Sequence, residues 1–62
     1  MIADEIFYID ECEAMLIVTE EGDYVSWFTD IPVSAEGNTK EECKSNLKSM
    51  LDYYIKEIRD DP

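Results

Sequence analysis

The stretch Gly37-Asn38-Thr39-Lys40-Glu41-Glu42 divides the chain into two halves with different hydrophobic periods. Before it, apolar residues come in short runs rich in β-branched and aromatic side chains, which is typical of strands. After it, they recur at spacings of three and four, which is typical of an amphipathic helix. Thr39, followed three residues later by Glu42, fits a capping box, so we expect the helix to begin there, with Asn38 as a competing N-cap.

Three apolar runs and one shorter segment precede this stretch. Gly22, in the turn after the second run, is free to adopt a positive φ, and Pro32 ends the third strand because it cannot donate to a ladder. The expected strands are about 5–9, 14–19, 24–29 and 33–35, and the expected helix is about 39–59. The sequence therefore predicts one α+β domain over residues 1–62, an antiparallel three- to four-stranded sheet with one C-terminal helix packed on one face.

The expected helix carries one apolar stripe and one row of lysines. The stripe consists of Cys43, Leu47, Met50, Leu51, Tyr54, Ile55 and Ile58. The lysine row consists of Lys40, Lys44, Lys48 and Lys56, with Asp52 among them. We interpret this row as a solvated helix face rather than a phosphate-binding stripe, and we expect Asp52 to pair with Lys56.

The strands are apolar on both faces, since side chains alternate along a strand. Ile6 and Tyr8 point to one side and Phe7 and Ile9 to the other, and the next two strands repeat this pattern. One helix covers one face, so the other is expected to need a partner. A homodimer through the sheet face or a sheet edge is the default, and a contact through Tyr53 or Tyr54 of the helix is the alternative. Which face the helix covers stays open at this point.

Charge is divided as unevenly as hydrophobicity. Residues 1–39 contain ten acids and no base, whereas residues 40–62 contain six acids and five bases, so the two parts carry −10 and −1 of the total of −11. Such a field repels nucleic acid and anionic membranes and accelerates the approach of a basic partner. We therefore expect a basic protein partner and no direct contact with nucleic acid or membrane.

The composition also argues against an enzyme. The chain has no His, which removes the commonest general base and metal ligand, and it has no glycine-rich phosphate loop. Neither a cofactor nor a metal site is expected, because the acid runs lack the spacing of a calcium loop. Cys12 and Cys43 are expected to be reduced thiols rather than a disulfide, because the N-terminus shows no export signal, and a cytoplasmic location is expected for the same reason.

One ordered set of motifs resembles a known family. These motifs are Gly22-Asp23-Tyr24-Val25-Ser26-Trp27-Phe28-Thr29-Asp30-Ile31-Pro32, then Gly37-Asn38-Thr39-Lys40-Glu41-Glu42, then Leu47 and Leu51. This order is similar to that of the HicB-like antitoxins. The resemblance implies a partial RNase H-like sheet with a helix on one face, which binds and blocks a small basic mRNA-cleaving toxin. The chain departs from the family where Val33-Ser34 replaces the frequent Gly-Cys, and it is not expected to carry the DNA-binding tail of many members.

We therefore predict a small acidic antitoxin-like module that occludes the active surface of a basic RNA-cleaving toxin or similar partner. The expected partner-binding residues are Glu20, Glu21, Asp23, Tyr24, Trp27 and Asp30. In this set the acids steer the partner and the two aromatic residues anchor it. One alternative is an acidic mimic of nucleic acid, of the kind a phage could encode, which inhibits a host defence or nucleic-acid-binding protein. Another is a structural dimerisation module whose acids serve only solubility.

Overall fold

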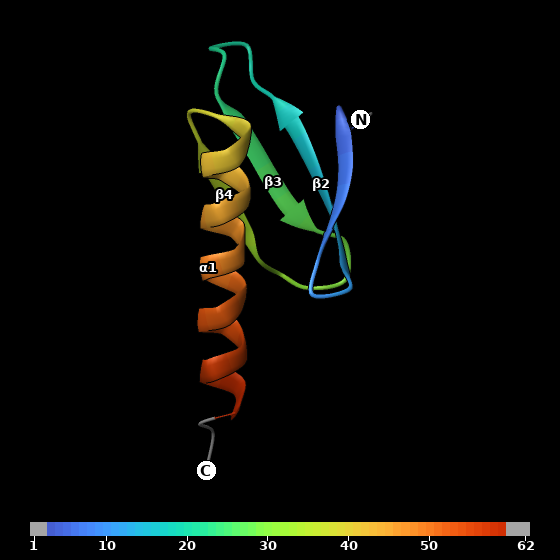
Figure 1. The fold of residues 1–62 in the computed structure, drawn as a ribbon, viewed down its shortest axis with the longest axis vertical. Helices are drawn as coiled ribbons and strands as arrows, with labels where there is room; N and C mark the ends of the chain where they lie inside the picture. The colour runs from blue at the N-terminus through green and yellow to red at the C-terminus, as the bar shows by residue number, and fades with distance from the viewer. Residues whose placement is uncertain (1–2, 60–62) are drawn as a thin grey trace.

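A computed structural model describes residues 3–59 and shows a four-stranded antiparallel sheet with one helix on one of its faces (Figure 1). The elements are β1 (Glu5–Ile9), β2 (Cys12–Val18), β3 (Tyr24–Phe28), β4 (Ser34–Gly37) and α1 (Lys40–Arg59). Strand order in the sheet equals order in the chain, so the sheet is a meander. The predicted fold class is confirmed. β2 begins two residues earlier than expected, and β4 runs from 34 to 37 rather than from 33 to 35.

The early start of β2 follows from a two-residue turn that the sequence conceals. Ile9 pairs with Cys12, so Asp10 and Glu11 alone connect β1 to β2. Their φ angles are 49° and 70°, which is the left-handed backbone of a type I′ turn. This turn usually contains Asn or Gly, and a residue such as Glu11 pays a conformational cost in it. Without the usual turn residues, the hairpin cannot be recognised from the residue types.

The other connections behave as their residues predict. Gly22 has a φ of 89° in the turn between β2 and β3. After β3, the chain bends at Pro32, and the N–H of Val33 donates to the carbonyl of Ile31 at 2.7 Å. Val33 is buried beside the strands rather than part of β4, with 7% of its surface exposed. Its carbonyl accepts a hydrogen bond from the N–H of Phe28 at 3.1 Å, which ties the corner to the sheet.

The start of α1 is held by the predicted cap and by a glycine contact. The Oγ1 of Thr39 accepts the N–H of Glu42 at 3.0 Å, and the carboxylate of Glu42 accepts the N–H of Asn38 at 3.1 Å. A Cβ on Gly37 would lie 2.6 Å from the backbone nitrogen of Cys43. Gly37 thus lets the first helical turn approach the end of β4, which sets the position of the helix on the sheet.

The covered face of the sheet carries the core. Residues on this side include the fully buried Ala14, Leu16 and Ser26, and they lie beneath Leu47 and other helix residues. The thiol of Cys43 donates to Ser26 Oγ at 3.1 Å in the buried layer between helix and sheet, and both Cys12 and Cys43 are free thiols. The question of which face the helix covers is thereby settled. It covers the face of Phe7, Ile9, Leu16 and Phe28, not the face of Trp27.

The helix is longer than the sheet it covers. Its 20 residues span about 30 Å, whereas a five-residue strand spans about 17 Å. Two of the seven residues predicted for the buried stripe are exposed, for different reasons. Ile58 lies past Leu51, the last fully buried helix residue, whereas Met50 lies between the fully buried Leu47 and Leu51, so its exposure comes from its direction around the helix axis. Met50 is 46% exposed and Ile58 is 56% exposed. Figure 1 shows the last helical turns extending past the strands.

Candidate protein-binding face

We call the side of the sheet that faces away from α1 the open face. The strand register places Ile6, Met15 and Trp27 in one row across it and Ile17 and Val25 in a second. Ile6 is 56% exposed and the other four are half-buried. No described helix lies over these side chains. Apolar surface gathered in this way on a small domain is typical of a protein-binding site.

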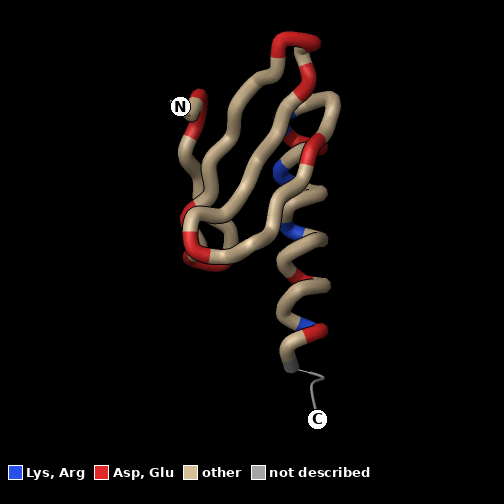
Figure 2. Tube along the Cα trace, turned by 180° about the vertical axis from the view of Figure 1, so that it is seen from behind, with Lys and Arg blue, Asp and Glu red and all other residues tan. Residues whose placement is uncertain are grey.

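Acids surround this apolar centre, and the sheet layer has no base. Figure 2, seen from the side opposite to Figure 1, shows acids gathered at the two ends of the sheet and lysines only on the helix. Glu13 and Glu36 also lie on the open face, opposite Tyr8 and Val25 in the register. The Tyr8 hydroxyl donates to the Glu13 carboxylate at 3.4 Å. The open face is thus apolar in the middle and negative around its margin.

The structure divides the six predicted partner-binding residues among four places. Glu20, Glu21 and Asp23 lie in the turn between β2 and β3, at one end of the sheet. Trp27 lies on the open face, paired with Met15 on one side and Ser34 on the other. The remaining two residues are Tyr24 and Asp30. Tyr24 lies on the opposite face from Trp27, because the two are three positions apart along β3, an odd number, and Asp30 follows β3 at its far end.

The turn that carries three of these acids is well ordered by hydrogen bonds. The N–H of Thr19 donates to the carbonyl of Asp23 at 2.7 Å, and its Oγ1 accepts the N–H of Asp23 at 3.1 Å. Within this frame the side chains of Glu20 and Glu21 are exposed. Among residues 3–58, the recorded ion pairs use Glu5, Asp10 and Asp52 and none of the four predicted steering acids. Those four carboxylates therefore remain available to a partner.

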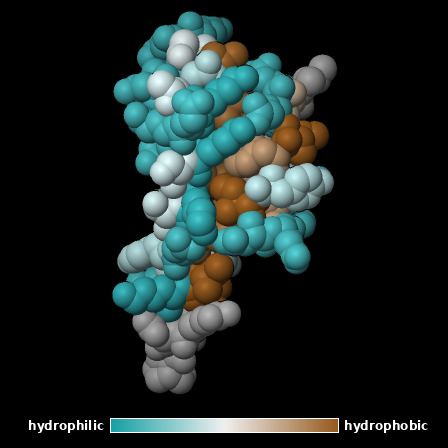
Figure 3. All heavy atoms as spheres, in the orientation of Figure 1, coloured by the Kyte–Doolittle hydropathy of each residue, from teal (hydrophilic) through white to brown (hydrophobic). Residues whose placement is uncertain are grey.

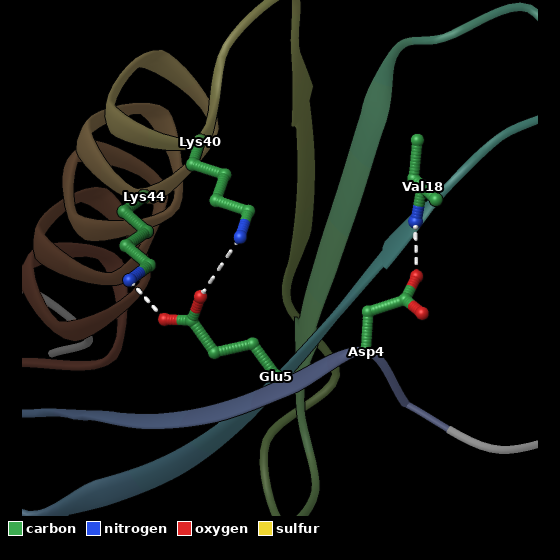
Figure 4. A network of polar contacts seen from close by, with 5 residues as sticks. All are labelled: Asp4, Glu5, Val18, Lys40 and Lys44. Atoms are coloured by element: carbon green, nitrogen blue, oxygen red, sulfur yellow. Dashed lines mark hydrogen bonds and ion pairs between the residues drawn. The ribbon is translucent and has the colours of Figure 1, made fainter.

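Acids near the start of the chain have structural partners instead. Figure 4 shows Glu5 pointing to the helix, where its carboxylate forms ion pairs with Lys40 at 3.6 Å and with Lys44. The adjacent Asp4 accepts the N–H of Val18 at 2.8 Å. The hydrogen bond from Lys44 lowers the pKa of Glu5, despite an opposing effect of desolvation. Glu5 thus ties β1 to the helix and does not belong to the binding face.

The lysine row has a role that its spacing alone does not reveal. Lys48 donates to Asp10 at 3.1 Å, and this hydrogen bond raises the pKa of Lys48. Lys44 lies 4.8 Å from the centre of the Phe7 ring and also contacts Glu5. The interpretation as a merely solvated face is therefore incomplete, because three lysines reach across to β1 and its turn. Asp52 forms an ion pair with Lys48, at 3.5 Å, rather than with the expected Lys56.

Beneath these lysines runs a groove of about 550 Å³ between β1 and α1. It exists because α1 lies against β4 and β3 and is too narrow to cover all four strands. Phe7 and Ile9 form its apolar side, and Ser45 and Ser49 lie on its helix side. Its charged lining residues, Lys44, Lys48 and Asp52, already take part in ion pairs. The groove is therefore less suited to bind a charged ligand than the open face is to bind a basic partner.

The residues that sequence reasoning could not assign to a site are Ile6, Met15, Ile17 and Val25. They alternate along their strands so that they share a face with Trp27, but the residues of the other face are apolar as well, so hydrophobicity does not distinguish the two sets. The distinguishing signal is side-chain size. Four small residues lie on the covered face, where the helix approaches, although larger ones such as Leu16 and Phe28 lie there too. The small residues are Ala14, Ser26, Ala35 and Gly37.

Within residues 3–59, α1 lacks the long apolar stretch that crossing a bilayer requires. A scan against known protein families finds no matching family model, and searches of curated proteins and of solved structures find no match either. The resemblance to HicB-like antitoxins therefore stays a hypothesis.

Proposed function

We propose that this chain is a small acidic binding module that covers a basic protein with its open face. The partner we favour is a small basic RNA-cleaving toxin, as the resemblance to HicB-like antitoxins implies. The observation that carries the proposal is the open face itself, an apolar row of Ile6, Met15 and Trp27 on a layer without a single base. The module acts by occlusion rather than by catalysis, and we expect it to act in the cytoplasm.

The division of labour across the site follows from burial and charge. Trp27 and Met15 provide apolar contact at the centre, where desolvation makes aromatic side chains contribute most. Glu20 and Glu21 lie at one end, are exposed and take part in no recorded ion pair, so they attract a basic partner from a distance. Of the two predicted aromatic anchors, the proposal keeps Trp27 on the contact surface and assigns Tyr24 to the covered side.

The arrangement of acids favours this proposal over a mimic of nucleic acid. A mimic needs acids spaced regularly along its surface, like phosphates. Here most of them gather at the two ends of the sheet (Figure 2), and the row of Ile6, Met15 and Trp27 between those ends is apolar. An apolar centre contributes little to a site that accepts a phosphate backbone, because such sites are polar and positively charged.

The test uses a small basic toxin ribonuclease of the class blocked by HicB-like antitoxins, with cleavage of a fluorescent RNA and binding kinetics as readouts. We expect Trp27→Ala to increase the dissociation rate about tenfold or more, because it removes an aromatic anchor. We expect the double change Glu20→Lys and Glu21→Lys to lower the association rate about tenfold at low salt. Inhibition of RNA cleavage should weaken in both variants.

The matched control is the double change Glu41→Lys and Glu57→Lys, which alters net charge equally but lies on the helix. It should leave the association rate nearly unchanged. Equal effects of the two double variants would indicate that bulk charge alone attracts the partner, which is the behaviour expected of a nucleic-acid mimic. No binding of the toxin at low salt, or no effect of Trp27→Ala, would contradict the proposal.

A further inference from the structure

The second uncovered apolar surface lies on the helix, away from the proposed binding face. Leu51, 1% exposed, is the last fully buried helix residue, and the chain continues as helix to residue 59. We call residues 52–58 the overhang, since Figure 1 shows the end of α1 beyond the sheet. Figure 3 shows hydrophobic surface beside these turns. The overhang makes the molecule 42 Å long against 19 and 16 Å in the other directions.

Two residues of the overhang form a regular stripe with Met50, and Tyr53, 61% exposed, lies next to Tyr54 in the chain. Met50, Tyr54 and Ile58 follow each other at four-residue intervals, so they share one side of the helix. Met50 and Ile58 are 46% and 56% exposed, and Tyr54 and Ile55 are half-buried at the edge of the core. No other described element lies beyond the sheet to cover them. A helix with an apolar stripe of this kind normally packs on another helix.

We infer that the overhang pairs with the overhang of a second copy in an antiparallel two-fold contact. Charge selects this occupant. The part of the chain that contains the helix has a net charge of only −1, so two helices approach without strong repulsion, whereas two sheet halves of −10 each repel. An antiparallel pair keeps the sheets at opposite ends, and a parallel pair would bring them together.

The register of the pair follows from the stripe. With Tyr54 near the two-fold axis, Met50 of each copy lies opposite Ile58 of the other, and the two exposed apolar residues cover each other. The contact is self-complementary, as a two-fold interface requires. It spans only two helical turns and so buries less than the roughly 800 Å² per partner of a standard interface. The dimer is therefore expected to dissociate at micromolar concentrations, and it leaves both open faces accessible.

The inference can be tested by sedimentation velocity of the full chain at concentrations of about 5 to 500 micromolar. This range brackets the Kd expected for a weak dimer. Ile58→Glu should abolish dimerisation or weaken it at least tenfold. Ile6→Glu is a closely matched control, because Ile6 and Ile58 are both 56% exposed and the charge change is identical. Ile6→Glu should leave the dimer unchanged. A monomeric wild-type chain at all concentrations, or a dimer disrupted by Ile6→Glu and not by Ile58→Glu, would overturn the inference.

Disulfide cross-linking tests the register. Met50→Cys and Ile58→Cys are made separately in a Cys12→Ser background, where the remaining Cys43 is buried. A mixture of the two should cross-link faster than either alone, since like positions lie about 12 Å apart along the axis and unlike ones lie side by side. Cross-linking of a single variant as fast as the mixture would refute the register. These measurements require no toxin, so their failure would leave the proposed function standing.

Discussion

The two faces of the sheet are built from alternate residues of the same strands, yet the helix buries one and leaves the other partly exposed. On the covered face, Ala14 and Ser26 are small and fully buried, and helix residues such as Leu47 fill the space above them. On the open face, Met15 and Trp27 are large and remain partly exposed. Both faces are apolar, so hydrophobicity alone does not decide which one the helix covers. The covered face differs in having small residues, among them Gly37, at points where the helix backbone comes close to a strand.

The largest expected effect is a difference in the free energy of unfolding between substitutions on the two faces. Leu47→Ala removes a fully buried side chain above the covered face and should lower the free energy of unfolding by about 2–5 kcal/mol, because it leaves a cavity. Met15→Ala on the open face should cost about 1 kcal/mol or less, because the side chain is already half-exposed. Urea denaturation followed by Trp27 fluorescence measures both. Similar losses in the two variants would contradict the assignment of the faces.

The next effect concerns the contact that positions the helix. Gly37→Ala places a Cβ against the backbone of Cys43. The first turn of α1 would have to shift away from β4 to make room for it. The expected loss is about 1–3 kcal/mol, as for other overpacked sites. The control is Gly22→Ala, which meets no atom within 4 Å and so reports only the cost of its positive φ, about 1–2 kcal/mol. Thermal unfolding by circular dichroism compares them, and a stable Gly37→Ala variant would show that the helix can approach differently.

The smallest effect is a pH dependence at the edge of the covered face. The pKa of Glu5 is lowered in the folded chain, so its stabilising effect is complete above its ordinary pKa of about 4.3 and is lost as pH falls through the lower folded value. The stability gap between the wild-type chain and Glu5→Gln should therefore narrow as the pH falls below the ordinary pKa of Glu5. Urea midpoints at several pH values measure this gap. A gap that stays constant or widens in acid would show that the contacts of Glu5 with Lys40 and Lys44 do not stabilise the fold.

The sequence predicted the fold class because the hydrophobic periodicity and the turn and capping residues indicate nearly the same element boundaries. Gly22, Pro32 and the cap at Thr39 each act through local backbone chemistry, which residue type reveals directly. The Asp10–Glu11 turn escaped prediction because neither residue is typical of a left-handed backbone. The exposure of Ile58 escaped it because helical periodicity gives a direction around the axis but not the length of the sheet beneath, and that of Met50 because the stripe was drawn wider than the face that the sheet covers.

The candidate site was predicted less completely than the fold. Glu20 and Glu21 lie in the turn at one end of the sheet and Trp27 lies on the open face, and their role in binding stays a prediction. Tyr24 and Trp27 are both predicted as anchors because they are aromatic residues of one strand, although an odd separation along a strand places them on opposite sides. The number of acids was evident from composition, but their separation into structural and unpaired groups depends on contacts between β1 and α1 that are distant in sequence.

The strictly sequential order of the strands has a consequence for how the chain folds. Each strand pairs with the one before it across a short connection, so the sheet can assemble from local steps and should form quickly. The helix follows the strands in the chain, however, and until it docks the meander has two apolar faces in water. Such an intermediate is prone to stack with others of its kind. The ten acids of the first 39 residues repel neighbouring chains during that interval, so the charge that attracts a basic partner to the folded molecule also protects the molecule while it folds.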